Sequence, residues 1–156
     1  MKMRNLSVWG CAAVALALGI LSGCSKPDEA AADLNLSTVV FPNGTKIVAE
    51  TLRSDFEMRR GLMFRDSLAP DRGMLFVHPK PDKYTYWTYQ IKIPLDMIWI
   101  DRDRKIVEIL PNVQPCTTNA AQCPHYGGHY PANFVLELNA GAAAKNNLQE
   151  GMILDF

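Results

Sequence analysis

The sequence lacks a nucleophile elbow, a glycine-rich phosphate loop and a helical metal-binding motif. It also lacks a charge excess, because 16 basic residues balance 16 acidic ones. Nucleic-acid-binding domains rely on clustered positive charge, so this balance indicates no nucleic-acid partner. No internal repeat is present, which excludes solenoid and array folds. We therefore expect a protein with no metal and no other cofactor.

Long hydrophobic runs are scarce, and one of them lies at the N-terminus. Lys2 and Arg4 precede an apolar stretch from about Leu6 to Leu21, and Ser22-Gly23-Cys24 follows. This order is typical of a secretory signal peptide, and a cysteine after Leu-Ser-Gly resembles a bacterial lipobox. The sequence therefore predicts a signal peptide over residues 1–23 and a lipid on Cys24. The alternative is an uncleaved membrane anchor, for which the run is short, since a span needs about 20 residues.

Lipidation sets the expected location of the mature chain. Two or three acyl chains, palmitate among them, hold a protein stably on a membrane, whereas one chain binds only marginally. Ser25 occupies the place where aspartate acts as a retention signal in enteric bacteria, so we expect the periplasmic face of the outer membrane. Residues 24–36 are polar and rich in small residues, which predicts a flexible tether. Residues 37–156 then form a single domain in the cell envelope.

Two of the four cysteines lie in or directly after the signal peptide. Cys116 and Cys123 remain, and such a pair in an exported protein predicts a disulfide. The alternative is a zinc site that adds His125 and His129. The pair Gly127-Gly128 between the histidines disfavours the helix that such a site prefers.

The stretch Tyr86 to Asp101 combines apolar, aromatic and β-branched residues, which is typical of central strands. Pro94 interrupts it, so two adjoining strands are expected. Side chains alternate along a strand, which places Ile98 and Ile100 on one face and Met97 and Trp99 on the other. Both faces are apolar, so the strand is expected to be covered on both sides.

The remaining pattern predicts short strands and little helix. Ser37–Phe41 and Thr45–Leu52 flank a turn and form a hairpin. Ser54 opens a capping box for a helix that ends near Gly61, with Phe56 and Met63 facing the core. Other predicted elements are strands at 73–77, 105–110, 134–138 and 152–156 and a helical turn at 140–147. The fold class expected is mainly β, a small antiparallel β-sandwich or barrel with one or two short helices.

Several spaced motifs carry a family resemblance. They are Gly61-Leu62-Met63-x-Arg65, Gly73-Met74-Leu75-Phe76, Trp87, Ile93-Pro94-Leu95-Asp96 and Val135-Leu136-Glu137-Leu138-x-Ala140-Gly141. From about Thr38 to the C-terminus, the chain resembles the bacterial and archaeal domain of unknown function family 192. The resemblance implies a mostly antiparallel, jelly-roll-like β fold and no established reaction.

Charged residues inside apolar motifs are the candidate functional residues. In a structural interpretation, Arg65 pairs with Asp96 or Glu137 and so offsets the cost of a buried charge. In a functional one, Arg65 binds an anion or carboxylate through its planar donor fork, and Trp87, Tyr89 and Trp99 offer flat faces to a sugar or ring.

We expect a lipid-anchored envelope protein whose non-catalytic β domain binds a small polar ligand or a partner protein. The ligand-binding candidates are Arg65, Trp87, Tyr89, Asp96 and Glu137. One alternative is a hydrolase-like enzyme that uses Arg65, His78, Asp96 or Glu137. Another is a structural factor of envelope assembly, which would show an exposed apolar patch.

Overall fold

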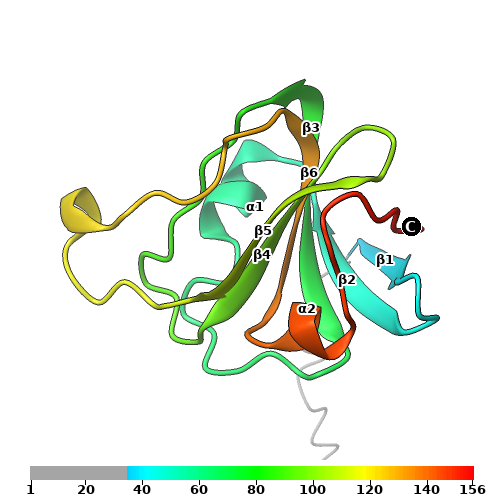
Figure 1. Ribbon diagram of the computed structural model, residues 1–156. Coiled ribbons are helices and arrows are strands. Elements are labelled where there is room, and N and C mark those ends of the chain that lie inside the picture. Colours follow the sequence, from blue (N-terminus) through cyan, green and yellow to red (C-terminus); the bar gives the residue numbers. More distant parts are fainter. Residues whose placement is uncertain (1–34) are drawn as a thin grey trace, which may run out of the picture. The chain divides into compact units, whose positions relative to one another are not determined.

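A computed structural model describes residues 35–156 and contains one six-stranded sheet in the order β1-β2-β3-β6-β4-β5 (Figure 1). The strands are β1 Leu36–Val40, β2 Lys46–Leu52, β3 Arg72–Asp82, β4 Leu95–Ile100, β5 Ile106–Val113 and β6 Ala132–Asn139. The helices are α1 Asp55–Arg60, α2 Ala142–Lys145 and the single 3₁₀ turn η1 Ala120–Gln122. The predicted signal peptide, the lipidation site Cys24 and most of the predicted tether lie outside the described residues.

The expected mainly β class with two short α-helices is confirmed. Within that class the sheet is mixed, because β2 and β3 pair in parallel while the other neighbours pair antiparallel. Over the part of the chain that the structure describes, it stays open and does not close into a barrel. The parallel pair follows from the long connection 53–71, since parallel neighbours need a crossover of a dozen or more residues. This crossover carries α1.

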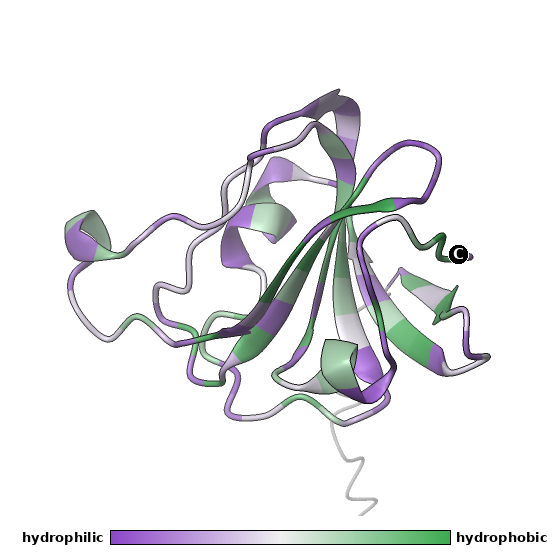
Figure 2. Ribbon diagram, viewed as in Figure 1, coloured by the Kyte–Doolittle hydropathy of each residue, from purple (hydrophilic) through white to green (hydrophobic). Residues whose placement is uncertain are grey.

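The sheet is apolar on both faces, as the alternation in β4 predicts. Ile98 and Ile100 belong to a cluster covered by α2 and the C-terminal residues, whereas Met97 and Trp99 belong to a second cluster on the opposite face. Figure 2 shows hydrophobic residues concentrated along the central strands and hydrophilic ones in the loops. All six residues of β4 are buried, so this strand is the centre of the domain.

The prediction of a strand before Pro94 is wrong. Residues 86–93 contribute only isolated bridges, Tyr86 to Tyr126 and Tyr89 to Cys116. The Ile91 N–H donates to the Thr88 carbonyl at 3.1 Å, and Gln90 has a φ of 57°. Because the segment turns on itself, it does not extend the sheet, and Tyr86 packs against the face that holds Trp99. The C-terminal residues 152–156 likewise form isolated bridges in place of the predicted last strand.

Helix α1 begins as the capping box predicts. The Glu57 N–H donates to the Ser54 hydroxyl, and the Ser54 N–H donates to the Glu57 carboxylate. The expectation that Phe56 faces the core is wrong, since this side chain is 71% exposed. The helix has only six residues and lies across the surface, so Met58 is the residue that it turns toward the sheet.

Cys116 and Cys123 form the predicted disulfide. The two sulfur atoms that the alternative zinc site would use are therefore bonded to each other and not to a metal. The two histidines of that alternative have other contacts, since His129 Nδ1 lies 2.6 Å from Glu108 Oε1 and the His125 ring stacks on Trp87. Across the described residues, no group of three or more potential metal-ligating side chains occurs.

Reduction of this disulfide should lower the melting temperature. The two cysteines are seven residues apart, and closing so short a loop stabilises the folded state by about 2.5 kcal/mol on the chain-entropy model. Thermal unfolding with and without reductant measures the loss. A Cys116→Ser/Cys123→Ser variant is the control, because reductant should leave its melting temperature unchanged. A wild-type protein that is indifferent to reductant would contradict the prediction.

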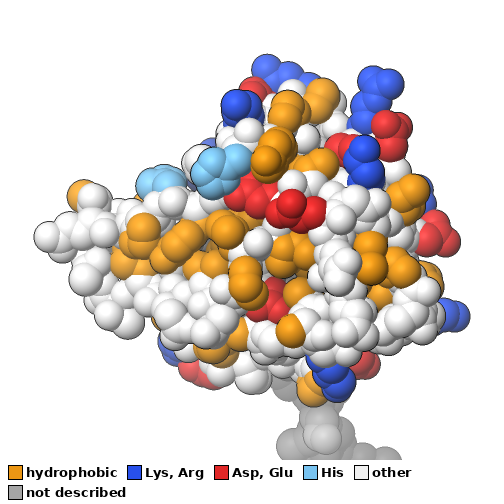
Figure 3. All heavy atoms as spheres, in the orientation of Figure 1, with side chains coloured by type: hydrophobic (Ala, Val, Ile, Leu, Met, Phe, Trp, Pro, Cys, Tyr) orange, Lys and Arg blue, Asp and Glu red, His pale blue; other side chains and the backbone are white. Residues whose placement is uncertain are grey.

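The surface carries no concentration of basic charge in the view of Figure 3. Lysine and arginine side chains lie at the periphery of this face, and a band of hydrophobic side chains with some acidic ones crosses its middle (Figure 3). Within residues 35–156, no helix is both long enough and apolar enough to span a bilayer.

Candidate functional site

Helix α1 and the residues that follow it form a cleft over the face of the sheet that holds Trp99. An open pocket of about 340 Å³ lies on one side of the helix, and one of about 430 Å³ lies on the other. Segment 84–87 and His78 line the first pocket. Glu50, Phe64 and Arg65 line the second. These pockets bring together side chains from β2, β3, the crossover and segment 84–93.

Glu137 lies between the two pockets, at the floor of the cleft. It is on β6 in register with Met74 of β3 and Met97 of β4, so three neighbouring strands surround it with apolar side chains. Its side chain is 1% exposed, and Oε2 has no hydrogen-bond partner among the described residues. Burial raises the pKa of Glu137 from 4.5 to about 8. The carboxyl group is therefore mostly protonated at neutral pH.

A small cavity of about 30 Å³ adjoins Glu137. It shares Met58, Tyr86 and Trp87 with the first pocket and Gly61 and Met63 with the second. This volume accommodates about one ordered water or one small polar group. The cavity thus places a buried carboxyl group beside both open pockets.

Tyr86 lines the cavity beside Glu137 and is paired with His78. Its hydroxyl lies 2.9 Å from His78 Nε2, and the His78 ring stacks on Tyr84 with 3.4 Å between centroids. Burial lowers the pKa of His78, so this imidazole is neutral at pH 7. Burial and the nearby Glu137 raise the pKa of Tyr86. His78, Tyr86 and Glu137 are therefore uncharged at neutral pH, and the hydrogen bond among them that the structure shows joins His78 to Tyr86.

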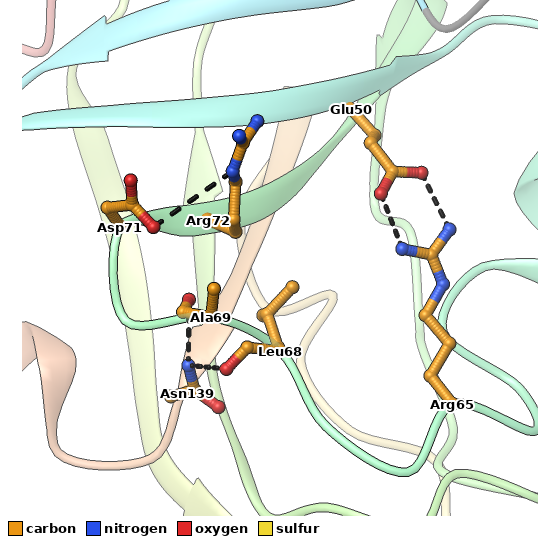
Figure 4. Close-up of polar contacts among 7 residues, drawn as sticks. All are labelled: Glu50, Arg65, Leu68, Ala69, Asp71, Arg72 and Asn139. Atoms are coloured by element: carbon orange, nitrogen blue, oxygen red, sulfur yellow. Dashed lines mark hydrogen bonds and ion pairs between the residues drawn. The ribbon is translucent and has the colours of Figure 1, made fainter. Parts of the chain in front are cut away.

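The predicted partner of Arg65 is wrong. Arg65 forms a bidentate ion pair with Glu50 of β2, with Nη2 2.6 Å from Oε2, and not with Asp96 or Glu137 (Figure 4). The preceding Phe64 has a φ of 67°, which turns the chain so that Arg65 points toward β2. Side-chain exposure is 37% for Arg65 and 18% for Glu50, so the pair borders the second pocket and is not part of the core.

Loss of this ion pair should have only a small effect on stability. Because the pair is partly exposed, water screens it, and we expect Arg65→Ala to lower the free energy of unfolding by about 1 kcal/mol. A double-mutant cycle with Glu50→Ala measures the coupling by chemical denaturation. Lys92→Ala is the matched control, because Lys92 forms a more exposed ion pair with Asp66. A loss of several kcal/mol would show that Arg65 supports the core.

Asp96 lines none of the pockets that flank α1. It is fully buried and accepts three backbone N–H bonds, from Asn112 at 2.9 Å, Gly141 at 3.1 Å and Ala143 at 2.8 Å. These bonds tie β4 to the end of β5 and to the start of α2. Its carboxylate therefore has a structural use in this fold.

The two aromatic candidates are divided between pockets. Trp87 lines the first pocket, whereas Tyr89 lines a third pocket of about 340 Å³ that includes Cys116 and Phe64. Their rings are 5.4 Å apart and tilted by 41°. The structure thus brings Trp87, His78 and Glu137 to one cleft and leaves Tyr89 at its edge. Sequence analysis missed Tyr86 and Met58, because nothing in their local pattern separates them from ordinary core residues.

Backbone strain marks the same cleft. Phe64 and Gln90 both have positive φ, 67° and 57°, and the Phe64 N–H donates to the Gln90 carbonyl at 3.0 Å. Non-glycine residues in this region cost roughly 1–3 kcal/mol each and cluster at functional sites. The loops that carry them form the walls of the second and third pockets.

Comparison with known proteins places the chain among uncharacterised relatives. Residues 38–156 match the model of DUF192, described as uncharacterized ACR. A crystal structure from Sinorhizobium meliloti 1021, named as a candidate transcription regulator, is 28% identical with a TM-score of 0.68, covering 76% of this chain and 89% of its own. The crystal structure of a protein of unknown function from Novosphingobium aromaticivorans DSM 12444 is 29% identical with a TM-score of 0.69. The match covers 81% of this chain and 89% of the other chain. No curated protein matches.

Proposed function

Since the chain belongs to the uncharacterised DUF192 family through residues 38–156, we propose its function from the cleft: the β domain binds a small polar ligand beside α1, and an N-terminal lipid holds it at the cell envelope. The observation that carries the ligand proposal is Glu137, a fully buried carboxyl group with an oxygen that has no partner in the described residues. Buried polar groups are nearly always satisfied, so such a group in a native fold calls for an external partner.

The walls of the cleft suit a small ligand. Tyr84, Tyr86 and Trp87 supply aromatic surface in the first pocket, and His78 adds a polar edge. Ligand sites combine predominantly apolar and aromatic walls with a few polar groups that fix orientation. The cleft around α1 has this composition.

A second arrangement of the same groups favours an enzyme. Burial shifts the pKa of Glu137 upward and that of His78 downward, and groups shifted in opposite directions can serve as an acid and a base. The enzyme alternative therefore keeps His78 and Glu137, while Asp96 and Arg65 are used in the fold and in the pair with Glu50.

Capture of a ligand tests the proposal and separates it from the enzyme alternative. The full-length protein in detergent is incubated with a small-molecule extract of the producing cells, washed, and released for mass spectrometry. Wild type should retain a compound that Trp87→Ala loses, and Tyr130→Ala is the control, since Tyr130 is 54% exposed and lines none of the pockets around α1. A compound recovered with an altered mass would favour the enzyme. Equal retention by all three proteins would reject a ligand at this cleft.

The lipid anchor gives a prediction of its own. The apolar run from about Leu6 and the Leu21-Ser22-Gly23-Cys24 sequence support acylation of Cys24. Cys24→Ser should abolish fatty-acid labelling and move the protein from the membrane fraction to the soluble or unprocessed pool. Metabolic labelling with a radioactive fatty acid measures this result, with Cys11→Ser as the matched control. Equal labelling of wild type and Cys24→Ser would reject the anchor.

The name of the Sinorhizobium meliloti relative is not part of this proposal. A regulator that binds nucleic acid needs a basic surface. Here basic and acidic residues are equal in number, and basic side chains are dispersed on the face in Figure 3.

A further inference from the structure

The cavity beside Glu137 offers a buried carboxyl oxygen that has no partner among the described residues. The Tyr86 hydroxyl is engaged with His78. Among backbone N–H groups of the wall, Gly61 donates to Glu57, Met63 to Arg60 and Ile91 to Thr88. An anion or a carbonyl oxygen in this cavity would find as donors the Glu137 hydroxyl, the Trp87 indole N–H and the exposed side chains of Arg59 and Arg60. At the Glu137 oxygen that has no partner among the described residues, a ligand group that itself donates hydrogen bonds fits best.

Three aromatic side chains lie around the same cavity. Phe76, Tyr86 and Trp87 line the cavity, and the Phe76 and Tyr86 rings meet edge to face with 4.9 Å between centroids. Ring faces attract cations, most strongly when water is excluded. A carboxyl group enclosed by aromatic rings and methionines is complementary to an ammonium group.

We propose that this cavity is the subsite for a protonated amine of the ligand, which Glu137 receives as a carboxylate after giving its proton to solvent. The inference rests on the proposed ligand-binding function and names the chemical class of the ligand. The body of the amine would lie in the first pocket, beside Tyr84 and Trp87, because that pocket shares Tyr86 and Trp87 with the cavity.

The other charged or titratable groups near Glu137 do not provide this charge complement. Arg59 and Arg60 at the end of α1 line the cavity, but both are exposed. Tyr86 comes from segment 84–93, and β3 adds His78 beyond it. The register partners on β3 and β4 are the uncharged Met74 and Met97. Glu137 is therefore the group at the cavity wall that can become negative.

Coupled proton release gives the proposal a distinctive pH dependence. The pKa of Glu137, about 8 without ligand, should fall when an ammonium group binds. Affinity for the amine should then rise up to about tenfold per pH unit below pH 8 and level off above it. A ligand that accepts a hydrogen bond from the protonated carboxyl would show the opposite sign and bind more weakly above pH 8.

Three four-carbon probes separate these cases: butylammonium, butanol and butyrate. The full-length protein in detergent, labelled with ¹³C at glutamate carboxyl groups, is titrated with each probe by NMR, and calorimetry between pH 6 and pH 9 gives the affinities. Butylammonium should lower the pKa of Glu137, and butanol should leave it unchanged. Glu137→Gln, which keeps the shape of the side chain, should weaken butylammonium binding at least tenfold at pH 8 and above while the far-UV circular dichroism is retained. Trp87→Leu should weaken it less.

Each other outcome is decisive. Binding of butyrate or butanol at Glu137, with no effect of butylammonium, would overturn the amine subsite while leaving a ligand site in the cleft. No change at Glu137 with any probe would assign the cavity to bound water and overturn the inference, whereas the retention experiment with Trp87→Ala would still decide the proposed function. Equal butylammonium binding by wild type and Glu137→Gln would also overturn it.

Discussion

Replacement of Glu137 by glutamine should make the folded protein more stable above pH 8. In the folded state burial raises the pKa of Glu137 from 4.5 to about 8, and the unfolded chain returns it to the ordinary value. Between these values the folded state holds a proton that the unfolded state has lost. The free energy of unfolding of the wild type must therefore fall as pH rises through this window.

The expected loss of unfolding free energy follows from the difference between the pKa values of Glu137 in the unfolded and folded states. Each pKa unit corresponds to about 1.4 kcal/mol, so Glu137 should reduce the stability of the wild type by about 4 kcal/mol between pH 5 and pH 9. Glutamine does not titrate and should remove this slope, with similar stability at pH 5 and a clear gain at pH 9. Chemical denaturation of both proteins at several pH values gives the difference.

A matched substitution controls for the loss of one negative charge. Glu150→Gln lies at an exposed position and should leave the pH profile of the wild type unchanged. If Glu137→Gln shows the same pH slope as the wild type, Glu137 does not titrate in this window and the uncharged floor of the cleft is wrong.

Asp96→Ala should have the opposite effect and destabilise the protein by roughly 3–5 kcal/mol. Its carboxylate is fully buried and accepts three backbone N–H bonds, from Asn112, Gly141 and Ala143. Alanine leaves those donors without partners at the junction of β4, β5 and α2. Asp96→Asn should also destabilise the protein. The asparagine NH₂ group is a donor, so it cannot accept a hydrogen bond from the backbone N–H groups that face it.

Asp101→Ala is the control for Asp96. Asp101 accepts two backbone N–H bonds in the β4–β5 turn, and its side chain is 21% exposed, so water can replace it and the loss should be about 1 kcal/mol. Urea unfolding of the variants gives both values. Equal losses for Asp96→Ala and Asp101→Ala would contradict the structural role of Asp96.

Two buried acidic residues thus behave differently although both stand in apolar sequence motifs. Asp96 meets three N–H groups supplied by β5 and by the start of α2, whereas Glu137 meets methionines and aromatic rings. Hydrophobic alternation predicted that both lie in or beside strands. It could not predict their partners, because those partners are set by strand order and by the positive φ of Asn112 and Gly141.

Much of the local structure could be predicted from the sequence. The hairpin of β1 and β2, the capping box at Ser54 and the two faces of β4 depend on neighbours a few residues apart. The parallel pairing of β2 and β3 could not be predicted in the same way, since it depends on the crossover packing back onto the sheet. Segment 86–93 has strand-like composition, yet tertiary contacts place it on a face of the sheet.

The same limit applies to the candidate site. Glu137, Trp87 and His78 could be identified as residues of interest, and the structure groups them around one cleft. The partner of Arg65 could not, because the positive φ of Phe64 redirects the side chain to Glu50. Tyr86, which pairs with His78 and lines the cavity beside Glu137, has no local signal beyond being aromatic.

The crossover between β2 and β3 covers part of the cavity beside Glu137. Helix α1 forms part of the cavity wall, yet none of its residues is buried, and both ends of the crossover are fixed in the sheet. Segments with few buried contacts open at a small fraction of the free energy of global unfolding. We expect α1 to detach and return while all six strands stay paired. Exchange of small molecules with the floor of the cleft would then be governed by the local stability of two helical turns, and the sheet would serve as the fixed base against which they close.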